Sequence, residues 1–293
     1  MPNLELVPKR DLSPFRKVAI GTWQNAYDPS VYGTLSLRME PALRYIEAFR
    51  RATGKRVTVT HMMARAVAAA LEKMPDANAI LRFNRIYLRQ HINVFFNVVM
   101  EDPVTGEIDL SGTNIKDADQ KSLEDIVDEF TAKVDKVRAS KDKQLENSRN
   151  MFRRIPNFFL NRMLKLLSFF SYTLNLDLRW MGVPKDAFGS IIVTNIGTMG
   201  LDVGYVPLVP YSRVPIVVAL GAVQDAPVVE DGRIVPAKIM NVCATLDHRI
   251  LDGAHAAIMA KTLRAWMEHP FDHFDSVSET KAVTAGDAEP DGD

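Results

Sequence analysis

The stretch TLDHRILDGAHAAIMAKTLRAWMEHP (residues 245–270) joins a predicted strand to a predicted helix. The apolar run that leads into it, IMNVCATL (239–246), is typical of a buried strand. Beyond Gly253 the apolar residues recur at three- and four-residue spacing, which predicts an amphipathic helix; they are Ala256, Met259, Leu263 and Trp266. We therefore expect His248 where the strand stops and Asp252 at the start of the helix.

Taken as residues alone, His248 and Asp252 each allow two interpretations. Imidazole exchanges a proton near neutral pH, so His248 is a candidate for acid–base chemistry. A histidine at the end of a strand is also often only structural. Asp252 is placed to cap the free backbone N–H groups of the helix, which would give it a structural role.

The composition describes an ordinary globular protein. The chain has 293 residues, of which 47% are hydrophobic, and 36 basic residues balance 36 acidic ones, so we expect a sizeable core and no nucleic-acid partner. Cys243 is the single cysteine and no Cys/His cluster has zinc spacing, so we expect no disulfide, no metal and a reducing cytoplasm. The sequence shows neither a signal peptide nor the roughly 20 apolar residues that a membrane span needs.

The rest of the chain alternates between helical and strand patterns. Early segments are mainly helical and later segments mainly apolar and β-branched, which predicts an α+β fold. The predicted helices are 15–27, 40–54, 122–140 and one that starts at the Thr58 cap and stops before Pro75. The predicted strands lie in 31–39, 85–101 (two strands), 189–200 and 214–236, the last with a hairpin turn at 230–232 (EDG).

The segment DHRILDGA (247–254) contains the pattern H-x-x-x-D-G. It resembles the active-site signature of the dihydrolipoyl acyltransferase catalytic domains of 2-oxo acid dehydrogenase complexes, a signature shared with chloramphenicol acetyltransferase. The resemblance runs from about residue 14 to 272. Four more stretches resemble the same family in the family's order: PFRKVAIGTW (14–23), TVTHMMARAVAAALEKMPDANA (58–79), GSIIVTNIGTMGLD (189–202) and VPIVVALGAVQDAPVVEDGRIV (214–235).

The resemblance implies a chloramphenicol acetyltransferase-like, two-layer α+β sandwich around a mixed β-sheet. It also implies a homotrimer, or a multiple of three, with each active site in a channel between neighbouring subunits. In this interpretation residues 1–14 form an N-terminal arm, residues 15–275 form the catalytic domain, and residues 276–293 form a disordered acidic tail.

The resemblance further implies an acyltransferase that uses coenzyme A or acyl-CoA as a substrate and needs no metal. His248 would be the general base that deprotonates a thiol or hydroxyl, which then attacks a thioester carbonyl. Thr194 matches the family's hydroxyl residue, which would donate to the tetrahedral oxyanion. Asp252 would be structural and paired with Arg16 from the first helix, because a buried aspartate and arginine are tolerable only together.

Two departures from the family leave the acceptor open. Family members in dehydrogenase complexes carry lipoyl domains before the catalytic domain, whereas about fourteen residues precede the first predicted helix here, so we expect no covalently bound lipoate on this chain. Residues 101–122 also lack the family's usual Gly-Leu-x-Thr-Pro loop. The main hypothesis is therefore an acyltransferase with an unidentified acceptor, for which a lipid-like molecule is one candidate. The alternatives are a dihydrolipoyl acyltransferase served by a lipoyl domain on a separate chain and a non-catalytic trimeric scaffold.

The segment 149–181 is longer than the family's connection at this point, and we interpret it as a hydrophobic, basic insertion. Three roles are open for residues 151–172. They could form a core helix at the trimer surface, a helix that lies on a membrane surface, or the lining of an apolar extension of the active-site channel. The apolar residues of this segment follow helical spacing and its charged residues are all basic: Phe158, Phe159, Met163, Leu166, Leu167 and Phe170, with Arg153, Arg154, Arg162 and Lys165.

Overall fold

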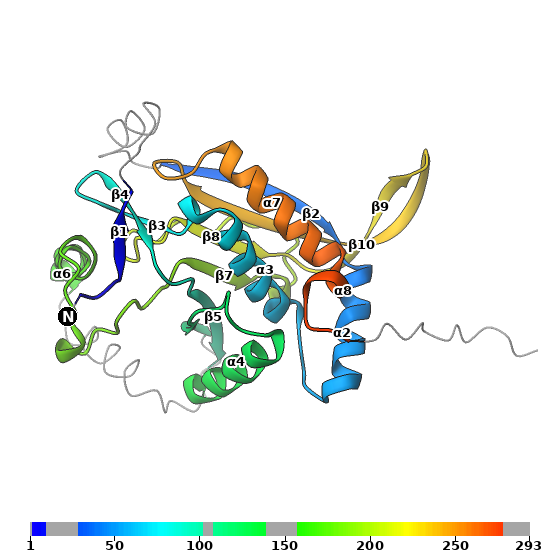
Figure 1. Ribbon diagram of the computed structural model, residues 1–293, viewed down its shortest axis with the longest axis horizontal. Coiled ribbons are helices and arrows are strands. Elements are labelled where there is room, and N and C mark those ends of the chain that lie inside the picture. The colour runs from blue at the N-terminus through cyan, green and yellow to red at the C-terminus, as the bar shows by residue number, and fades with distance from the viewer. Residues whose placement is uncertain (1, 10–28, 102–107, 139–156, 278–293) are drawn as a thin grey trace, which may run out of the picture.

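The computed structural model describes residues 2–9, 29–101, 108–138 and 157–277, and these residues form the predicted α+β fold (Figure 1). The strands are β1 (Leu6–Pro8), β2 (Ser30–Arg38), β3 (Ala79–Arg82), β4 (Arg85–Arg89), β5 (Val94–Glu101), β6 (Ile108–Ile115), β7 (Ile191–Asn195), β8 (Ile216–Leu220), β9 (Gln224–Glu230) and β10 (Arg233–Asp247). The larger sheet has the order β2-β10-β8-β7-β5-β6, with β9 paired to β10, and the smaller sheet has the order β1-β4-β3.

The larger sheet is mixed, as the resemblance implies. Strand β7 pairs in parallel with β5 and β8, whereas β10 pairs antiparallel with β2, β8 and β9. The predicted turn joins β9 to β10 through Asp231 and Gly232, which both have positive φ as a tight hairpin turn requires. The strand predicted after this turn and the strand predicted at 239–246 are one continuous strand, β10, which crosses the molecule and ends next to His248.

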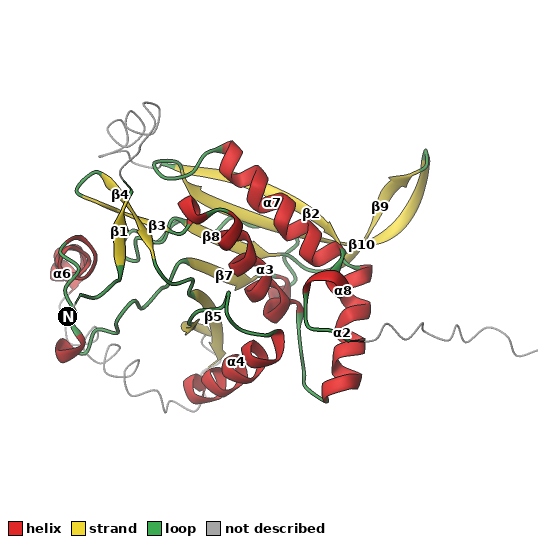
Figure 2. Ribbon diagram, viewed as in Figure 1, coloured by secondary structure: helices red, strands yellow, loops and turns green. Residues whose placement is uncertain are grey.

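The helices are α2 (Glu40–Thr53), α3 (Val59–Lys73), α4 (Leu123–Arg138), α6 (Asn157–Ser168), α7 (Gly253–Glu268) and α8 (Pro270–His273). Helices α2, α3, α4 and α7 cover one face of the larger sheet, and α6 lies beside the smaller sheet (Figure 2). The predicted helices 40–54 and 122–140 are confirmed, as is the helix predicted from the Thr58 cap to a stop before Pro75. The predicted end of α2 at Gly54 is also confirmed, since Gly54 has a left-handed conformation with φ 71°. The predicted helix 15–27 lies outside the described residues.

The core lies between this helical layer and the sheet. Alternate strand residues face it: Ile191 and Val193 of β7 belong to the main core cluster, whereas Ile192 belongs to a second cluster on the opposite face. The same alternation on β8 places Val218 in the main core and Val217 in the second cluster. Residue position along a strand therefore determines which of the two faces a side chain reaches.

The insertion predicted at 149–181 contains a helix, as its spacing predicts. Helix α6 continues into a π-helical turn, η2 (Phe169–Thr173), while residues 151–156 lie outside the described residues. Leu167 packs against Leu178 and Val183 in a small separate cluster. The segment is attached to the smaller sheet, because the Arg82 Nε donates to the Thr173 carbonyl oxygen at 2.9 Å.

His61 gives the fold a pH dependence. Its side chain closes the capping box at the start of α3, where Nδ1 accepts from the backbone N–H of Thr58 at 3.1 Å. Burial lowers the pKa of His61 to about 4 from an ordinary value of 6.5. Between about pH 6.5 and pH 4, His61 is therefore protonated in the unfolded chain and neutral in the folded chain. The free energy of unfolding falls as the pH drops through this range.

We expect this one group to account for about 3 kcal/mol of lost unfolding free energy across that range. His61→Gln keeps a capping side chain and removes the titration. Urea unfolding of both proteins at pH 7 and pH 4 measures the effect. At low pH, the unfolding free energy of the variant relative to wild type should be higher by that amount than at pH 7. A difference in unfolding free energy that does not change with pH would contradict the assignment.

Candidate active site

His248 lies in a tight turn immediately after β10. The backbone N–H groups of Ile250 and Leu251 both donate to the carbonyl oxygen of Asp247, at 3.0 and 2.9 Å. The N–H of His248 itself donates to the carbonyl oxygen of Pro29, just before β2, at 2.9 Å. The position predicted from the sequence is therefore confirmed, and the turn is attached to two neighbouring strands.

The imidazole of His248 is oriented by its own turn. Its Nδ1 lies 2.8 Å from the carbonyl oxygen of Leu251, and the ring is half-buried. A carbonyl oxygen can only accept a hydrogen bond, so Nδ1 carries the proton of the neutral ring. The lone pair is then on Nε2, which is the nitrogen that a general base needs. The sequence could not reveal this contact, because its acceptor is a backbone atom.

An ion pair fixes the residue before His248. The carboxylate of Asp247, which is buried, accepts hydrogen bonds from the Arg249 guanidinium at 2.9 and 2.6 Å and from the Arg249 backbone N–H at 3.0 Å. This pairing raises the pKa of Arg249 above its ordinary value. The two charged side chains on either side of His248 thus neutralise each other and hold the turn.

Asp252 caps α7, as the structural interpretation predicts. Its Oδ1 accepts from the backbone N–H groups of Ala254 and His255 at 3.0 and 3.3 Å and lies 2.6 Å from His255 Nδ1. His255 completes a capping box at this helix start and is a residue that the sequence did not single out. Arg16 lies outside the described residues, so its pairing with Asp252 stays a prediction.

Substitutions of Asp252 separate the cap from the ion pair. Asp252→Asn keeps a capping oxygen and removes the charge, whereas Asp252→Ala removes both. If Asp252 acts only as a cap, the asparagine variant should unfold with nearly wild-type free energy and the alanine variant should lose about 1 kcal/mol. If the pair with Arg16 forms, both variants should lose about 3–5 kcal/mol. Chemical denaturation of the two variants and of Arg16→Gln distinguishes the cases.

Thr194 lies near the end of β7 and is half-buried. It shares the face of Ile192, opposite the helical layer, and its hydroxyl has no hydrogen-bond partner among the described residues. The turn that follows is closely packed, because a Cβ on Gly197 would meet the Ala222 nitrogen at 2.6 Å. Asn195 organises this turn by accepting from the Thr198 N–H at 3.3 Å.

The structure does not bring Thr194 and His248 together within one chain. Thr194 is level with Ala219 on β8 and through it with Cys243 on β10, two strand spacings away. His248 is five positions further along β10, beyond its end. With about 4.8 Å between strands and about 3.3 Å per residue, their Cα atoms are on the order of 15–20 Å apart. Their side chains cannot both reach one reacting group in a single subunit.

An apolar cavity of about 280 Å³ lies between the sheet and α7. Its lining includes Leu246, two residues before His248, and Gly253, directly after Asp252. None of residues 161–168 of α6, whose side chains the structure describes, lines it. The interpretation of 151–172 as the lining of an apolar channel therefore gains no support from this cavity.

Among the described residues, no group of three or more His, Cys, Asp or Glu side chains is arranged to hold a metal ion. Within the same residues, every helix is too short or too polar to cross a membrane.

Comparison with known proteins identifies the family. The family described as "2-oxoacid dehydrogenases acyltransferase (catalytic domain)" matches residues 8–153 and 185–274. These two parts make up most of the chain and include His248, Asp252 and Thr194. This chain belongs to that acyltransferase family, as its sequence motifs predict. The matched parts leave out residues 154–184.

Curated relatives cover the same region. The chain is 23% identical over 219 residues to the dihydrolipoyllysine-residue acetyltransferase component of the acetoin cleaving system of Bacillus subtilis, covering 74% of this chain and 43% of that protein. It is 27% identical over 261 residues to a mitochondrial pyruvate dehydrogenase acetyltransferase component, component 3, of Arabidopsis thaliana, covering 87% and 39%. The chain thus spans about two fifths of the length of these relatives.

Solved structures confirm the fold. A probable dihydrolipoamide acetyltransferase from Listeria monocytogenes superimposes with a TM-score of 0.63 at 19% identity, covering 93% of this chain and 99% of that one. The dihydrolipoamide acetyltransferase of Azotobacter vinelandii gives a TM-score of 0.60 at 20% identity, covering 92% and 93%. The predicted acyltransferase-core fold is therefore correct.

Proposed function

We propose that this chain transfers an acyl group between coenzyme A and the thiol of a dihydrolipoyl group. The observation that carries the proposal is the orientation of His248, whose Nδ1 is held by the Leu251 carbonyl so that Nε2 can accept a proton. The names of the relatives favour a dihydrolipoyl acceptor over the unidentified acceptor of our main sequence-based hypothesis. The dihydrolipoyl group would come from a domain outside residues 1–293.

The proposed reaction needs one base and one hydrogen-bond donor. Nε2 of His248 takes the proton of the attacking thiol, and the sulfur then bonds to the thioester carbonyl carbon. The carbonyl oxygen becomes an oxyanion, to which the Thr194 hydroxyl donates. When the tetrahedral intermediate collapses, the bond to the leaving sulfur breaks and the imidazolium returns its proton to that sulfur. Coenzyme A is a substrate of the proposed reaction.

We place this site between subunits of a homotrimer. The separation of Thr194 and His248 within one chain supports this arrangement, because a neighbouring subunit could supply the hydroxyl that its own histidine cannot reach. The Azotobacter vinelandii structure is described as an investigation of a serine, a histidine and an asparagine in the catalytic mechanism. Its histidine and asparagine are four positions apart, as are His248 and Asp252, which supports the proposed roles.

A transfer assay tests the proposal. Purified protein is incubated with acetyl-CoA and dihydrolipoamide, and with longer and branched acyl-CoAs, and both thioester products are measured. Transfer above the uncatalysed rate is the expected result. If acyl-CoA binds but only other acceptors react, the acceptor assignment is wrong. If acyl-CoA neither binds nor reacts, the chain is better explained as a trimeric scaffold of the same fold.

We also propose that the helical segment around α6, which lies in the insertion relative to the family, contacts an anionic membrane surface. Large apolar side chains are exposed along it, including Trp180 at 81% and Leu166 at 56%. Arg162 and Lys165 are exposed on α6 as well. Bulky apolar groups mixed with basic ones are what a membrane-surface helix needs. This contact would place the enzyme next to a lipid surface.

Vesicle binding tests this contact. Replacing Arg162 and Lys165 by alanine should weaken binding to phosphatidylserine-containing vesicles by about 1 kcal/mol per residue. Trp180→Ser should weaken binding to the same vesicles further, whereas Lys136→Ala on α4 is the matched control and should change nothing. Sedimentation of protein with vesicles gives the partition. If wild-type protein does not bind these vesicles, the segment serves packing only.

A further inference from the structure

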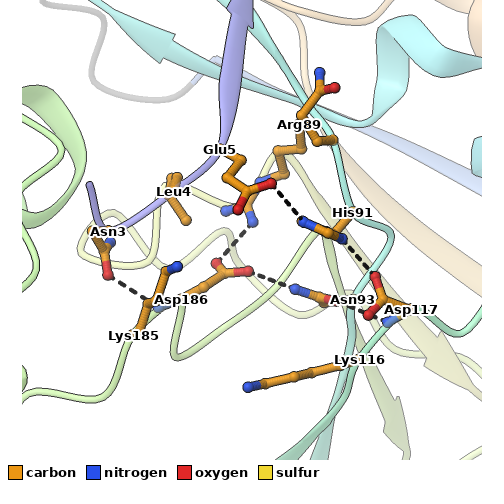
Figure 3. Close-up of a pocket in the computed structure, with 11 residues that line it drawn as sticks. Asn3, Leu4, Glu5, Arg89, His91, Asn93, Lys116, Asp117, Lys185 and Asp186 are labelled. Carbon is orange, nitrogen blue, oxygen red and sulfur yellow. Dashed lines mark hydrogen bonds and ion pairs between the residues drawn. The ribbon is translucent and has the colours of Figure 1, made fainter. Parts of the chain in front are cut away.

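A cavity of about 190 Å³, lined mainly by polar and charged residues, lies at the edge of the larger sheet (Figure 3). It is bounded by the residues before β1, the end of β4 and the loop from β4 to β5, the residues after β6 and the loop before β7. The side chains that matter for its chemistry are three carboxylates and four basic groups: Glu5, Asp117 and Asp186, with Arg89, His91, Lys116 and Lys185.

The carboxylates are already engaged by neighbouring groups. Asp186 lies 2.8 Å from Arg89 Nη1 through Oδ1 and accepts from Asn93 Nδ2 at 2.7 Å through Oδ2. His91 lies between the other two, with Nε2 3.0 Å from Glu5 and Nδ1 2.7 Å from Asp117 (Figure 3). A bound cation would have to displace these partners, so the cavity is poorly suited to a metal ion.

The hydrogen-bond donors, in contrast, exceed their partners. The Arg89 side chain is only 4% exposed, and its Nε and Nη2 have no hydrogen-bond partner in the part of the chain that the structure describes. Buried N–H groups without a partner are rare and costly, so they indicate an acceptor that completes the site. Lys116 and Lys185 line the same cavity, and their ammonium groups also have no partner among those residues.

We propose that this cavity binds a phosphate group, held by Arg89 with Lys116 and Lys185. A phosphate offers several acceptor oxygens and negative charge, which match the planar fork of a guanidinium and two ammonium groups. A single carboxylate would offer fewer acceptors for the same donors. Charge-assisted hydrogen bonds from a buried arginine are the strong component of such a site.

The phosphate can come from either of two sources. Val94 on β5 is level with Ile191 on the neighbouring strand β7. Through β8 it is also level with Leu246 on β10, three strands away, and Leu246 lies two residues before His248. The cavity is therefore at the same edge of the sheet as the His248 turn, on the order of 15 Å from it. One source is the phosphate-bearing end of coenzyme A, which rests on the proposed function. The other is a separate phosphorylated ligand.

The first measurement is calorimetric titration of the full chain with inorganic phosphate. Wild-type protein should bind it, and the double substitution Lys116→Ala/Lys185→Ala should weaken binding roughly tenfold or more. The lysines are substituted rather than Arg89, because removing Arg89 would leave the Asp186 carboxylate unpaired and could unfold the protein. Lys136→Ala is the control and should bind as wild type does.

The second measurement compares KM for acetyl-CoA with KM for acetyl-pantetheine, which has no phosphate. If the double substitution raises only the KM for acetyl-CoA, the phosphate belongs to the thioester. If it abolishes phosphate binding and leaves both KM values unchanged, the site serves a separate phosphorylated ligand. If phosphate affinity and both KM values are the same in the double variant as in wild type, the proposal is wrong. Inactivity with both thioesters would contradict the proposed function, and the calorimetric result would then decide this site alone.

Discussion

Replacing His248 by alanine is expected to lower kcat for acyl transfer about 10²–10⁴-fold, the usual contribution of a general base. The reason is local: the Leu251 carbonyl holds Nδ1, which leaves the Nε2 lone pair as the proton acceptor of the neutral ring. The free energy of unfolding should fall by only about 1 kcal/mol, because one hydrogen bond to a carbonyl is lost. Steady-state kinetics and chemical denaturation measure the two effects.

The matched control is His269→Ala, an exposed histidine at the other end of α7. It should retain wild-type kcat and KM. If His248→Ala also retains activity within a few-fold of wild type, His248 has no part in proton transfer. A loss of activity accompanied by unfolding would instead assign His248 a structural role.

Replacing Thr194 by valine should lower kcat about 10²-fold with little change in acyl-CoA binding, because an oxyanion donor acts only in the transition state. Valine keeps the branched shape that β7 favours, so the fold should survive. Thr194→Ser restores the hydroxyl and should recover most of the activity. Kinetics of the three proteins at saturating acyl-CoA provide the measurement.

Thr131→Val is the control for this series, since the Thr131 hydroxyl donates to the Val127 carbonyl oxygen within α4 at 2.7 Å, away from the site. It should not change kcat. An effect of Thr194→Val on KM alone would mean that the hydroxyl binds substrate rather than the oxyanion.

Much of the fold could be predicted from local patterns. The periodicity of α7, the glycine that ends α2 and the turn at Asp231–Gly232 each have a local physical cause, and each is confirmed. Strands β1, β3 and β6 were not predicted, because short strands without strong alternation depend on their partners. The expectation of helices early and a sheet late was too simple, since β2 near the start pairs along nine residues of β10.

The candidate site was predicted as residue types and only partly as geometry. The motif indicated His248, and the position of Asp252 indicated a cap. The carbonyl that orients His248, the Asp247–Arg249 pair and the capping partner His255 were missed, because backbone contacts and i, i+2 ion pairs have no distinctive sequence signal. The separation of Thr194 from His248 depends on the register of three strands, which a single sequence does not determine.

The central claim is that one site takes its histidine and its hydroxyl from different subunits, and complementation in mixed trimers tests it most directly. His248→Ala and Thr194→Val proteins are co-expressed with different tags, and doubly tagged trimers are purified. Each variant alone should be nearly inactive. Each doubly tagged trimer has one interface in three that pairs an intact histidine with an intact threonine, so activity should return to about a third of wild type. Mixed trimers no more active than their parents would contradict the shared site.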